Sequence, residues 1–379
     1  MNVTRLEVTC LTIPTDQPES DGTLEWDSTT IVIVEARAGN ATGLGWTYAP
    51  EAAAQVVSAK LADVVRGRSP DDVAALWLEG GAQLRNMGRP GIAWCALSAV
   101  DLALWDLRAR LYDVPLTALL PAVHDRVPVY GSGGFCSYTL DRLREQLGGW
   151  VEQGIPRVKM KLGREPERDP ERLDAAREAI GDDTELYVDA NGAFTAKRAI
   201  RWARRYADEW NVRWFEEPVS SADFEGLRLV REQTPVDVAA GEYAYVPADF
   251  RNLLGCVDCL QADVTRCGGI TGLLHVNGLA TAYGIDVSGH CAPQQSAHAL
   301  CAVDRLRHLE YFHDHDRIES MLFDGVLEPD GGALVPDRSR AGNGLELKRS
   351  EAERWARGVG STEPRKSVGA GLAGAGATQ

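Results

Sequence analysis

The 379-residue chain lacks long hydrophobic segments and any excess of basic residues. No apolar run reaches the roughly 20 residues that cross a bilayer. The first ten residues, MNVTRLEVTC, contain no signal-peptide core. The net charge of −15 argues against a nucleic-acid partner, because no basic patch dominates the chain. We therefore expect no membrane and no nucleic-acid partner, and a cytoplasmic location.

A regular arrangement of cysteines is also missing. The eight cysteines are scattered, mostly in apolar segments such as IAWCALSAV, which indicates reduced, buried thiols. Cys256 and Cys259 have CxxC spacing, but no second pair accompanies them as a zinc site would require. We expect no metal or redox role for this pair.

The first third of the chain predicts a mixed domain. LEVTCLTIP and STTIVIVEARA are typical of strands, with the polar segment TDQPESDGTLEWD between them as a loop. EAAAQVVSAKLADVVRG and AWCALSAVDLALWDLRARLY have helical periodicity. Strands followed by helices indicate an α+β domain, which we place at residues 1–124.

A different rhythm begins at residue 125, where short apolar segments alternate with helical ones. Strand–helix repetition predicts a parallel sheet, and eight such strands predict a (β/α)8-type barrel over residues 125–325. The tail, residues 361–379, is rich in Gly and Ala and is expected to be disordered. The eight expected strands are VPVYGSG, RVKMKLG, ELYVDAN, VRWFEEP, VDVAAGE, CLQADVT, GIDVSGH and RHLEYF.

Charged residues end seven of these strands, at intervals of 20 to 28 residues. In a barrel, this spacing places them at the C-terminal rim, where the active sites of such barrels lie. The seven residues are Lys161, Asp189, Glu216, Glu242, Asp263, His290 and Glu310.

Three of these strand-end residues predict a metal site. Asp189, Glu216 and Glu242 come from consecutive strands, so their carboxylates converge and repel each other unless a hard cation joins them. Oxygen ligands with open positions suit Mg²⁺, with Mn²⁺ as an alternative. Glu217 alternates away from Glu216 along the strand and is left outside the set.

The remaining strand ends predict acid–base chemistry. Lys159 and Lys161 share one strand face, which fits either an anion site or a solvated edge strand; a closed barrel has no edge to protect. Asp263 can hydrogen-bond His290 and fix its tautomer. We assign no chemistry to His313 and His315, which are expected in a loop or at the rim.

Together these segments resemble the enolase superfamily, in its mandelate racemase/muconate lactonizing enzyme-like group. The resemblance covers essentially the whole chain and rests on KMK, VDAN, FEEP, GE, DVTRCGGITG, GHCAP and HLEYF, with GLGWTYAP and SAVDLALWDLRARL nearer the N-terminus. It implies a modified (β/α)7β barrel and an α+β capping domain, 1–124, that residues 326–360 complete. It also implies a homo-oligomer.

The resemblance implies Mg²⁺-dependent removal of the α-proton of a small-molecule carboxylate substrate. Lys161 would be the base on one face, and His290 with Asp263 the catalyst on the other. Lys159 would stay protonated and lower the pKa of Lys161, and Glu310 would act as a protonated acid on a carboxylate oxygen. Two capping loops, 14–27 with Trp26 and 46–50 with Tyr48, would contact the substrate.

The fate of the resulting enediolate is open. Loss of a β-hydroxyl would make the protein an acid-sugar dehydratase that forms a 2-keto-3-deoxy acid. We favour this reaction, on an aldonic or related hydroxy acid. Return of a proton would make it a racemase or epimerase, and a barrel without catalysis is the remaining alternative. Asn191, expected to contact substrate, stands where some dehydratases of the family carry His, which argues against mannonate- or galactonate-type substrates.

Overall fold

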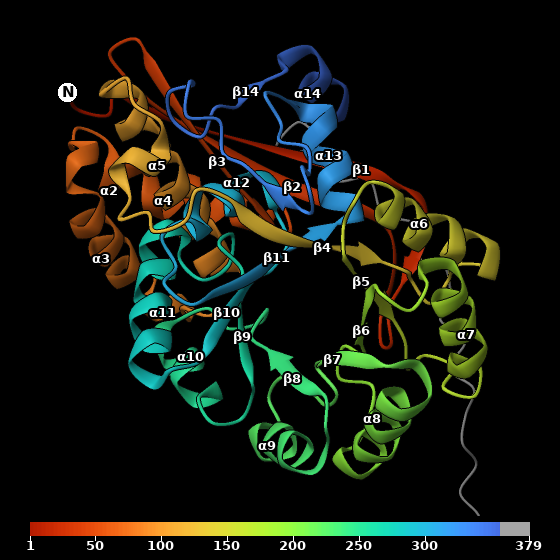
Figure 1. Cartoon of the computed structure of the whole chain (residues 1–379). Helices are drawn as coiled ribbons and strands as arrows, with labels where there is room; N and C mark the ends of the chain where they lie inside the picture. Colours follow the sequence, from red (N-terminus) through yellow and green to blue (C-terminus); the bar gives the residue numbers. More distant parts are fainter. Residues whose placement is uncertain (357–379) are drawn as a thin grey trace, which may run out of the picture.

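A closed barrel of parallel strands is covered at one end by an antiparallel sheet in the computed structural model of the chain, which describes residues 1–356 (Figure 1). The tail expected to be disordered, residues 361–379, lies outside the described residues, as does the end of the expected 326–360 return. Within residues 1–356, no helix is long and apolar enough to cross a membrane. The eight cysteines are free, and seven of them are buried.

The cap begins with three antiparallel strands, β1 (Arg5–Ser20), β2 (Glu25–Ala38) and β3 (Ala41–Tyr48), in that order across the sheet. The expected polar loop over 15–27 is wrong, because Glu19 pairs with Trp26 and only residues 21–24 form the turn. The ribbon tip is polar because it reaches the barrel mouth instead of solvent. A Cβ on Gly22 would meet the carbonyl oxygen of Ala190 at 2.4 Å, so the tip requires glycine.

Helices complete the cap and press it onto the barrel. The longest, α4 (Ile92–Leu111), is buried along nearly its whole length because it packs between β3 and the barrel helix α11 (Gly269–Tyr283). Gly45 permits this approach, since a Cβ there would lie 2.4 Å from the backbone of α4. The cap helices are α1 (Ala52–Val56), η1 (Val57–Leu61), α2 (Ala62–Val65), η2 (Pro70–Asp72), α3 (Val73–Gln83), η3 (Arg85–Met87), α4 (Ile92–Leu111) and α5 (Leu116–Leu119).

The barrel confirms the predicted (β/α)7β fold: within the described residues, eight parallel strands enclose it and seven helices connect them. Pairing of the last strand with the first closes the ring. The strands are β4 (Val127–Gly133), β5 (Arg157–Lys161), β6 (Glu185–Asp189), β7 (Val212–Glu216), β8 (Asp237–Ala240), β9 (Cys259–Ala262), β10 (Asp286–Gly289) and β11 (Leu306–Phe312). The helices between them are α6 (Leu140–Glu152), α7 (Asp169–Ile180), α8 (Ala196–Trp210), α9 (Phe224–Gln233), α10 (Pro247–Leu253), α11 and α12 (Pro293–Leu300).

After the barrel, the chain returns toward the cap. Ala352, in the last helix of the described chain, packs with Leu11 and Ile13 of β1. This return agrees with the expected completion of the cap, although the proposed domain boundaries remain predictions. The segment contains α13 (His313–Leu322), β12 (Phe323–Asp324), β13 (Ala333–Leu334), β14 (Glu346–Leu347) and α14 (Arg349–Trp355).

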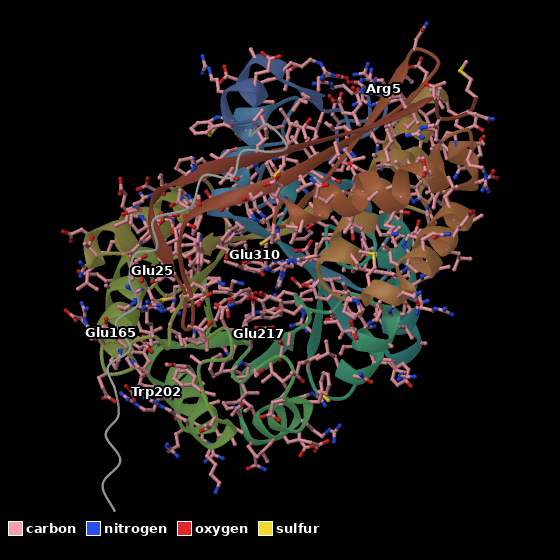
Figure 2. The ribbon with its side chains drawn as sticks, turned by 180° about the vertical axis from the view of Figure 1, so that it is seen from behind. Arg5, Glu25, Glu165, Trp202, Glu217 and Glu310 are labelled. Carbon is pink, nitrogen blue, oxygen red and sulfur yellow. The ribbon has the colours of Figure 1, made fainter. Side chains whose placement is uncertain are left out.

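The barrel interior is built in layers. Residues two apart on a strand share a face, so the inward residue before each charged strand end forms a lower layer. Tyr187, Trp214 and His308 occupy such positions, and their rings lie 5.1–5.5 Å apart between centroids. This aromatic layer fills the barrel beneath the charged residues, so they open only toward the cap. Figure 2 shows Glu310 and Glu217 near the centre of the molecule seen from behind.

Candidate active site

The seven predicted strand-end residues meet at the mouth of the barrel. Lys161, Asp189 and Glu216 are the last residues of β5, β6 and β7. Glu242, Asp263 and His290 follow β8, β9 and β10 by one or two residues, and Glu310 lies within β11. All seven side chains are buried, so the charges must satisfy one another.

The predicted metal ligands form one group. Asp189, Glu216 and Glu242 each offer an oxygen within 4.8 Å of the others. Three carboxylates around one point are a donor set that suits a hard divalent cation such as Mg²⁺. Glu217 stays outside this group, but its backbone leaves the strand conformation with φ +37°. Burial raises the pKa of Glu217, and the nearby carboxylates of Glu242 and Asp189 raise it further.

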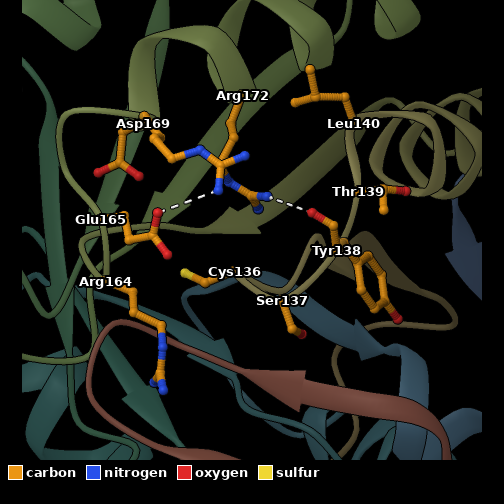
Figure 3. Close-up of a pocket in the computed structure, with 10 residues that line it drawn as sticks. Cys136, Ser137, Tyr138, Thr139, Leu140, Arg164, Glu165, Asp169 and Arg172 are labelled. Atoms are coloured by element: carbon orange, nitrogen blue, oxygen red, sulfur yellow. Dashed lines mark hydrogen bonds and ion pairs between the residues drawn. The ribbon is translucent and has the colours of Figure 1, made fainter.

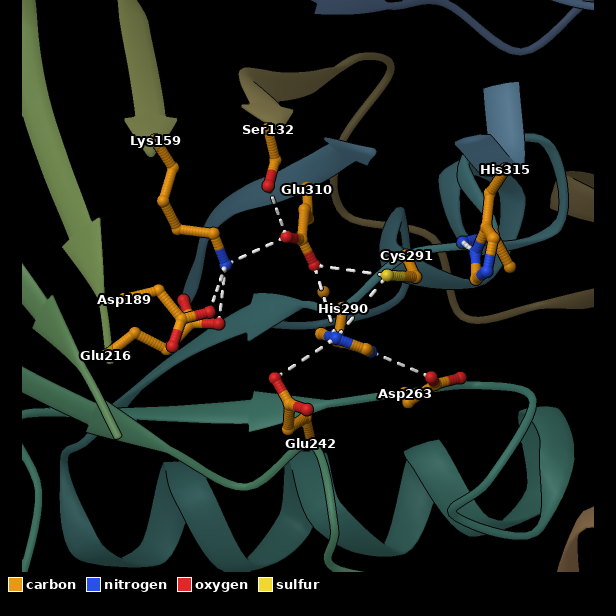
Figure 4. Close-up of polar contacts among 12 residues, drawn as sticks. Ser132, Lys159, Asp189, Glu216, Glu242, Asp263, His290, Cys291, Glu310 and His315 are labelled. Atoms are coloured by element: carbon orange, nitrogen blue, oxygen red, sulfur yellow. Dashed lines mark hydrogen bonds and ion pairs between the residues drawn. The ribbon is translucent and has the colours of Figure 1, made fainter. Parts of the chain in front are cut away.

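The two lysines of β5 neutralise these acids (Figure 4). Lys159 Nζ lies 2.5 Å from Glu216 Oε1 and 2.8 Å from Glu310 Oε1, and Lys161 Nζ lies 2.5 Å from Asp189 Oδ2. Burial lowers the pKa of Lys161, but Asp189 raises it more than Lys159 lowers it, so the net pKa is above its usual value. The expected depression is wrong for this arrangement.

Glu310 accepts several hydrogen bonds. Its carboxylate receives Ser132 Oγ at 2.6 Å and Cys291 Sγ at 3.2 Å, besides the Lys159 ammonium. Burial raises the pKa of Glu310, but Lys159 and His290 lower it more, so the net pKa is below its usual value. The expectation of a protonated acid is therefore wrong for these contacts.

The contacts of the two ring nitrogens fix the orientation of His290. Its Nδ1 lies 2.8 Å from Asp263 Oδ2, and its Nε2 lies 3.3 Å from carboxylate oxygens of both Glu242 and Glu310. Burial lowers the pKa of His290, but neighbouring Cys291, Glu242 and Glu310 raise it more, so the net pKa is raised. The predicted His–Asp pairing is present.

A cavity of about 520 Å³ lies between this cluster and the cap. The expected contact residues Trp26, Tyr48 and Asn191 all line it. Trp26 Nε1 donates to Glu19 at 2.8 Å, and the Tyr48 hydroxyl donates to Glu319 at 3.1 Å, so both rings are held in place. Asn191 Oδ1 is buried and has no partner among the described residues. It is thus an acceptor that a ligand can use.

Several residues of the cavity wall were not predicted from the sequence. His315, expected to carry no chemistry, lies in the first turn of α13 and lines the cavity, as do Arg266, Tyr243 and Phe312. Its position soon after Glu310, at the end of the last barrel strand, is the signal that could have found it. His313 does lie toward the rim, where its Nε2 is 3.0 Å from Asp16 Oδ2.

A second cavity, of about 280 Å³, lies beside the loops before α6 and α7 (Figure 3). Three arginines line it, but their charges are used internally. Arg172 donates to backbone carbonyls, including that of Tyr138 at 3.1 Å, and Arg168 lies 3.3 Å from Glu165. Arg164 contacts Glu25 at the tip of the β1–β2 ribbon. The protein itself therefore satisfies the charges of these arginines, and we assign the cavity no ligand.

Comparison with known proteins agrees with this geometry. Residues 142–352 match the family of enolase C-terminal domain-like proteins, and residues 7–121 match the mandelate racemase/muconate lactonizing enzyme N-terminal domain. The L-talarate/galactarate dehydratase of Salmonella typhimurium is 34% identical over 86% of this chain and 82% of its own. The 3,6-anhydro-alpha-L-galactonate cycloisomerase of Streptomyces coelicolor is 31% identical over 91% of this chain and 97% of its own.

Solved structures of similar proteins share this fold. A mandelate racemase/muconate lactonizing enzyme-like protein from Rubrobacter xylanophilus superposes with a TM-score of 0.93 at 59% identity, over 94% of this chain and all of the other. A racemase from Streptomyces coelicolor with bound magnesium superposes with a TM-score of 0.88 at 29% identity, over 94% of this chain and all of the other. The chain therefore belongs to the enolase superfamily, in the mandelate racemase/muconate lactonizing enzyme-like group.

Proposed function

We propose that the protein is a Mg²⁺-dependent dehydratase that removes water from an acid sugar and forms a 2-keto-3-deoxy acid. The observation that carries this proposal is the position of two proton-transfer groups around one cavity. Lys161 and His290 both line it, and the four strands β6 to β9 separate them along the barrel wall. Dehydration needs one group to take a proton and one to give a proton.

Each residue has a part in the proposed reaction. Lys161 takes the α-proton, and the electrons of the broken C–H bond move into the substrate carboxylate. Glu310 lines the cavity beside the carboxylate group, and Lys159, buried behind it, neutralises the charge of Glu310. The C–O bond at the β-carbon then breaks, and His290 gives a proton to the departing hydroxyl, which leaves as water. The enol that remains tautomerises to the 2-keto acid.

Asp189, Glu216 and Glu242 would hold the metal. When bound, Mg²⁺ supplies positive charge against the negative charge that develops on the substrate carboxylate. The same binding would withdraw the charge of Asp189 from Lys161, which the base role of Lys161 requires. Relatives support this choice, since they include an L-talarate/galactarate dehydratase, an arabinonate dehydratase and an L-rhamnonate dehydratase.

A racemase or epimerase is the second candidate. Two proton-transfer groups on different sides of a cavity also suit removal of a proton from one face and its return to the other. The Streptomyces coelicolor racemase, with its bound magnesium, shares the fold. The two candidates differ only in whether a hydroxyl leaves.

The test is incubation with Mg²⁺ and a library of acid sugars in D₂O, following α-proton exchange and 2-keto acid release. We expect both from at least one acid sugar. Exchange or epimerisation without keto acid would favour the racemase, and no exchange with any α-hydroxy acid would sink the proposal. Lys161→Ala and His290→Asn should each abolish turnover, whereas Lys60→Ala, on an exposed part of the cap, should not.

A further inference from the structure

His315 has a fixed orientation in the cavity wall. Its Nδ1 accepts a hydrogen bond from the Ala292 backbone N–H at 3.2 Å. The Tyr48 ring stacks on the imidazole with centroids 3.4 Å apart and planes 7° apart, and Phe312 meets it edge-on at 5.0 Å. The Ala292 N–H, the Tyr48 ring and the Phe312 ring together fix the orientation of the imidazole.

The same contacts set the protonation of His315. A nitrogen that accepts an N–H cannot carry its own proton, so the ring is neutral with its hydrogen on Nε2. Burial lowers the pKa of His315 to about 3, in surroundings that include the charged groups Asp263, His290, Arg266 and Glu310. Nε2 has no hydrogen-bond partner among the described residues of the chain, and His315 lines the cavity with only 6% of its surface exposed. The Nε2–H of His315 is thus an oriented hydrogen-bond donor that is available to a ligand in the cavity.

The wall on the cap side of the cavity is polar but offers no unpaired positive charge among its described residues. Its β1 and β2 residues include the hydroxyl-bearing Thr12, Ser28 and Thr30, together with Asp21 at the ribbon turn. Hydroxyl groups such as these recognise other hydroxyl groups, and an acidic neighbour repels an anion.

Arg266 is the cation nearest to serving a second substrate carboxylate, but its charge is already matched. Its Nε lies 3.3 Å from Asp263 Oδ2, and its Nη1 donates to the Glu242 backbone carbonyl at 3.1 Å. Its guanidinium also lies 5.3 Å from the centroid of the Tyr243 ring. Lys161 and His290 are bound to the acids of the reaction centre. A dicarboxylic substrate would therefore place its second charge against neutral and acidic groups.

We propose, on the basis of the function proposed above, that His315 is a specificity-determining residue that donates its Nε2–H to a hydroxyl at the far end of the substrate. The substrate is then a monocarboxylic polyhydroxy acid, not a dicarboxylic one. Figure 4 shows His315 beside Cys291, on the opposite side of the cluster from Lys159. From this position, His315 would contact the end of the sugar chain that lies away from the reacting carboxylate.

The first test compares acids that differ only at the far carbon. Gluconate with glucarate, and arabinonate with arabinarate, are such pairs, assayed with Mg²⁺ for 2-keto acid release. We expect kcat/KM for the preferred monocarboxylate to exceed that of its dicarboxylate by at least about tenfold. Equal or better turnover of the dicarboxylates would overturn the inference.

Variants test the role of His315 itself. His315→Phe keeps an aromatic ring against Tyr48 but removes the donor, and it should raise KM by about tenfold with little change in kcat, the loss of one neutral hydrogen bond. His315→Gln restores a donor and should recover most of the affinity. His313→Asn, two residues earlier in the sequence but outside the cavity, should match the wild type. A fall in kcat without a rise in KM, or equal losses in His313→Asn, would contradict the assignment.

Binding separates this inference from the proposed reaction. Calorimetric titration with Mg²⁺ present measures the affinity for each acid even if no acid sugar is turned over. Tighter binding of the monocarboxylate that weakens in His315→Phe would support the role of His315 while the dehydratase proposal fails. Binding of neither acid of any pair, or tighter binding of the dicarboxylates, would overturn the inference.

Discussion

Asp263 determines which nitrogen of His290 faces the cavity. Asp263 Oδ1 accepts both the backbone N–H and the hydroxyl of Thr265 at 2.7 Å. In Asp263→Asn the amide oxygen must stay toward Thr265, so the amide nitrogen turns toward His290 and donates to Nδ1. His290 is then held neutral, because an Nδ1 that accepts a hydrogen bond cannot carry a proton, and the imidazolium that gives its Nε2 proton to the departing hydroxyl no longer forms. We expect kcat to fall by about 10²- to 10⁴-fold with little change in KM, measured by steady-state kinetics.

A control for this substitution lies at the other end of the same strand. Asp258 precedes β9 and pairs with Arg231, away from the cavity. Asp258→Asn should keep the wild-type kcat. Equal losses in both variants would mean that the effect comes from the strand and not from the imidazole, and would contradict the role of Asp263 in keeping His290 protonated.

The residues of the site divide into those that a strand pattern reveals and those that it cannot. Lys161 and His290 were predictable because strand ends of a barrel converge on one rim. The position of His315 follows the same rule, but the orientation of its ring was not predictable, because it depends on Tyr48 of the cap and on the Ala292 N–H. The pKa of Lys161 was wrongly predicted for a similar reason. Lys159, on the same strand, was expected to set the pKa of Lys161, whereas the contact that raises this pKa comes from Asp189 on the next strand.

At the scale of elements, a buried acid joins the cap to the barrel. Asp101 of α4 accepts the Thr271 hydroxyl at 2.6 Å and the Thr271 backbone N–H at 3.0 Å, both from α11. Burial raises the pKa of Asp101 to about 7, although these hydrogen bonds lower it. The folded protein therefore keeps this proton between about pH 4 and 7, where the unfolded chain has lost it. The contribution to stability is full below this window and is lost as the pH rises through it.

This linkage predicts a pH-dependent difference between the wild type and Asp101→Asn. From pH 5 to pH 8, the free energy of unfolding of the wild type should fall by about 3 kcal/mol relative to the variant, measured by urea denaturation. Asp63→Asn, on the cap surface with its side chain 85% exposed, should follow the wild type at both pH values. A constant difference between wild type and Asp101→Asn would show that Asp101 is ionised in the folded protein.

At the scale of the whole molecule, the sequence predicted the barrel, its eight strands and the existence of the cap. Strand–helix alternation is local, and it determines the parallel ring almost by itself. Only the tip of the β1–β2 ribbon, residues 15–27, was wrongly predicted as a loop, because this polar segment is stabilised by the barrel, as in the hydrogen bond from the Cys136 N–H to the Ser20 carbonyl at 2.7 Å. Contacts between segments that lie far apart in the sequence leave no periodic pattern in it.

The three carboxylates of the expected metal site come from three strands, so binding of a cation there should stabilise the whole molecule. Asp189, Glu216 and Glu242 lie on or directly after β6, β7 and β8, and unfolding separates them. A cation that binds only the folded arrangement raises its stability according to its concentration and affinity. We expect Mg²⁺ to raise Tm by about 2–5 °C, and a chelator to reverse the shift, in differential scanning calorimetry. Glu242→Gln should lose most of it, whereas Glu165→Gln, beside the other cavity, should keep it. A full shift in Glu242→Gln would place the cation elsewhere, because an amide oxygen cannot replace one of only three charges without weakening a hard-ion site.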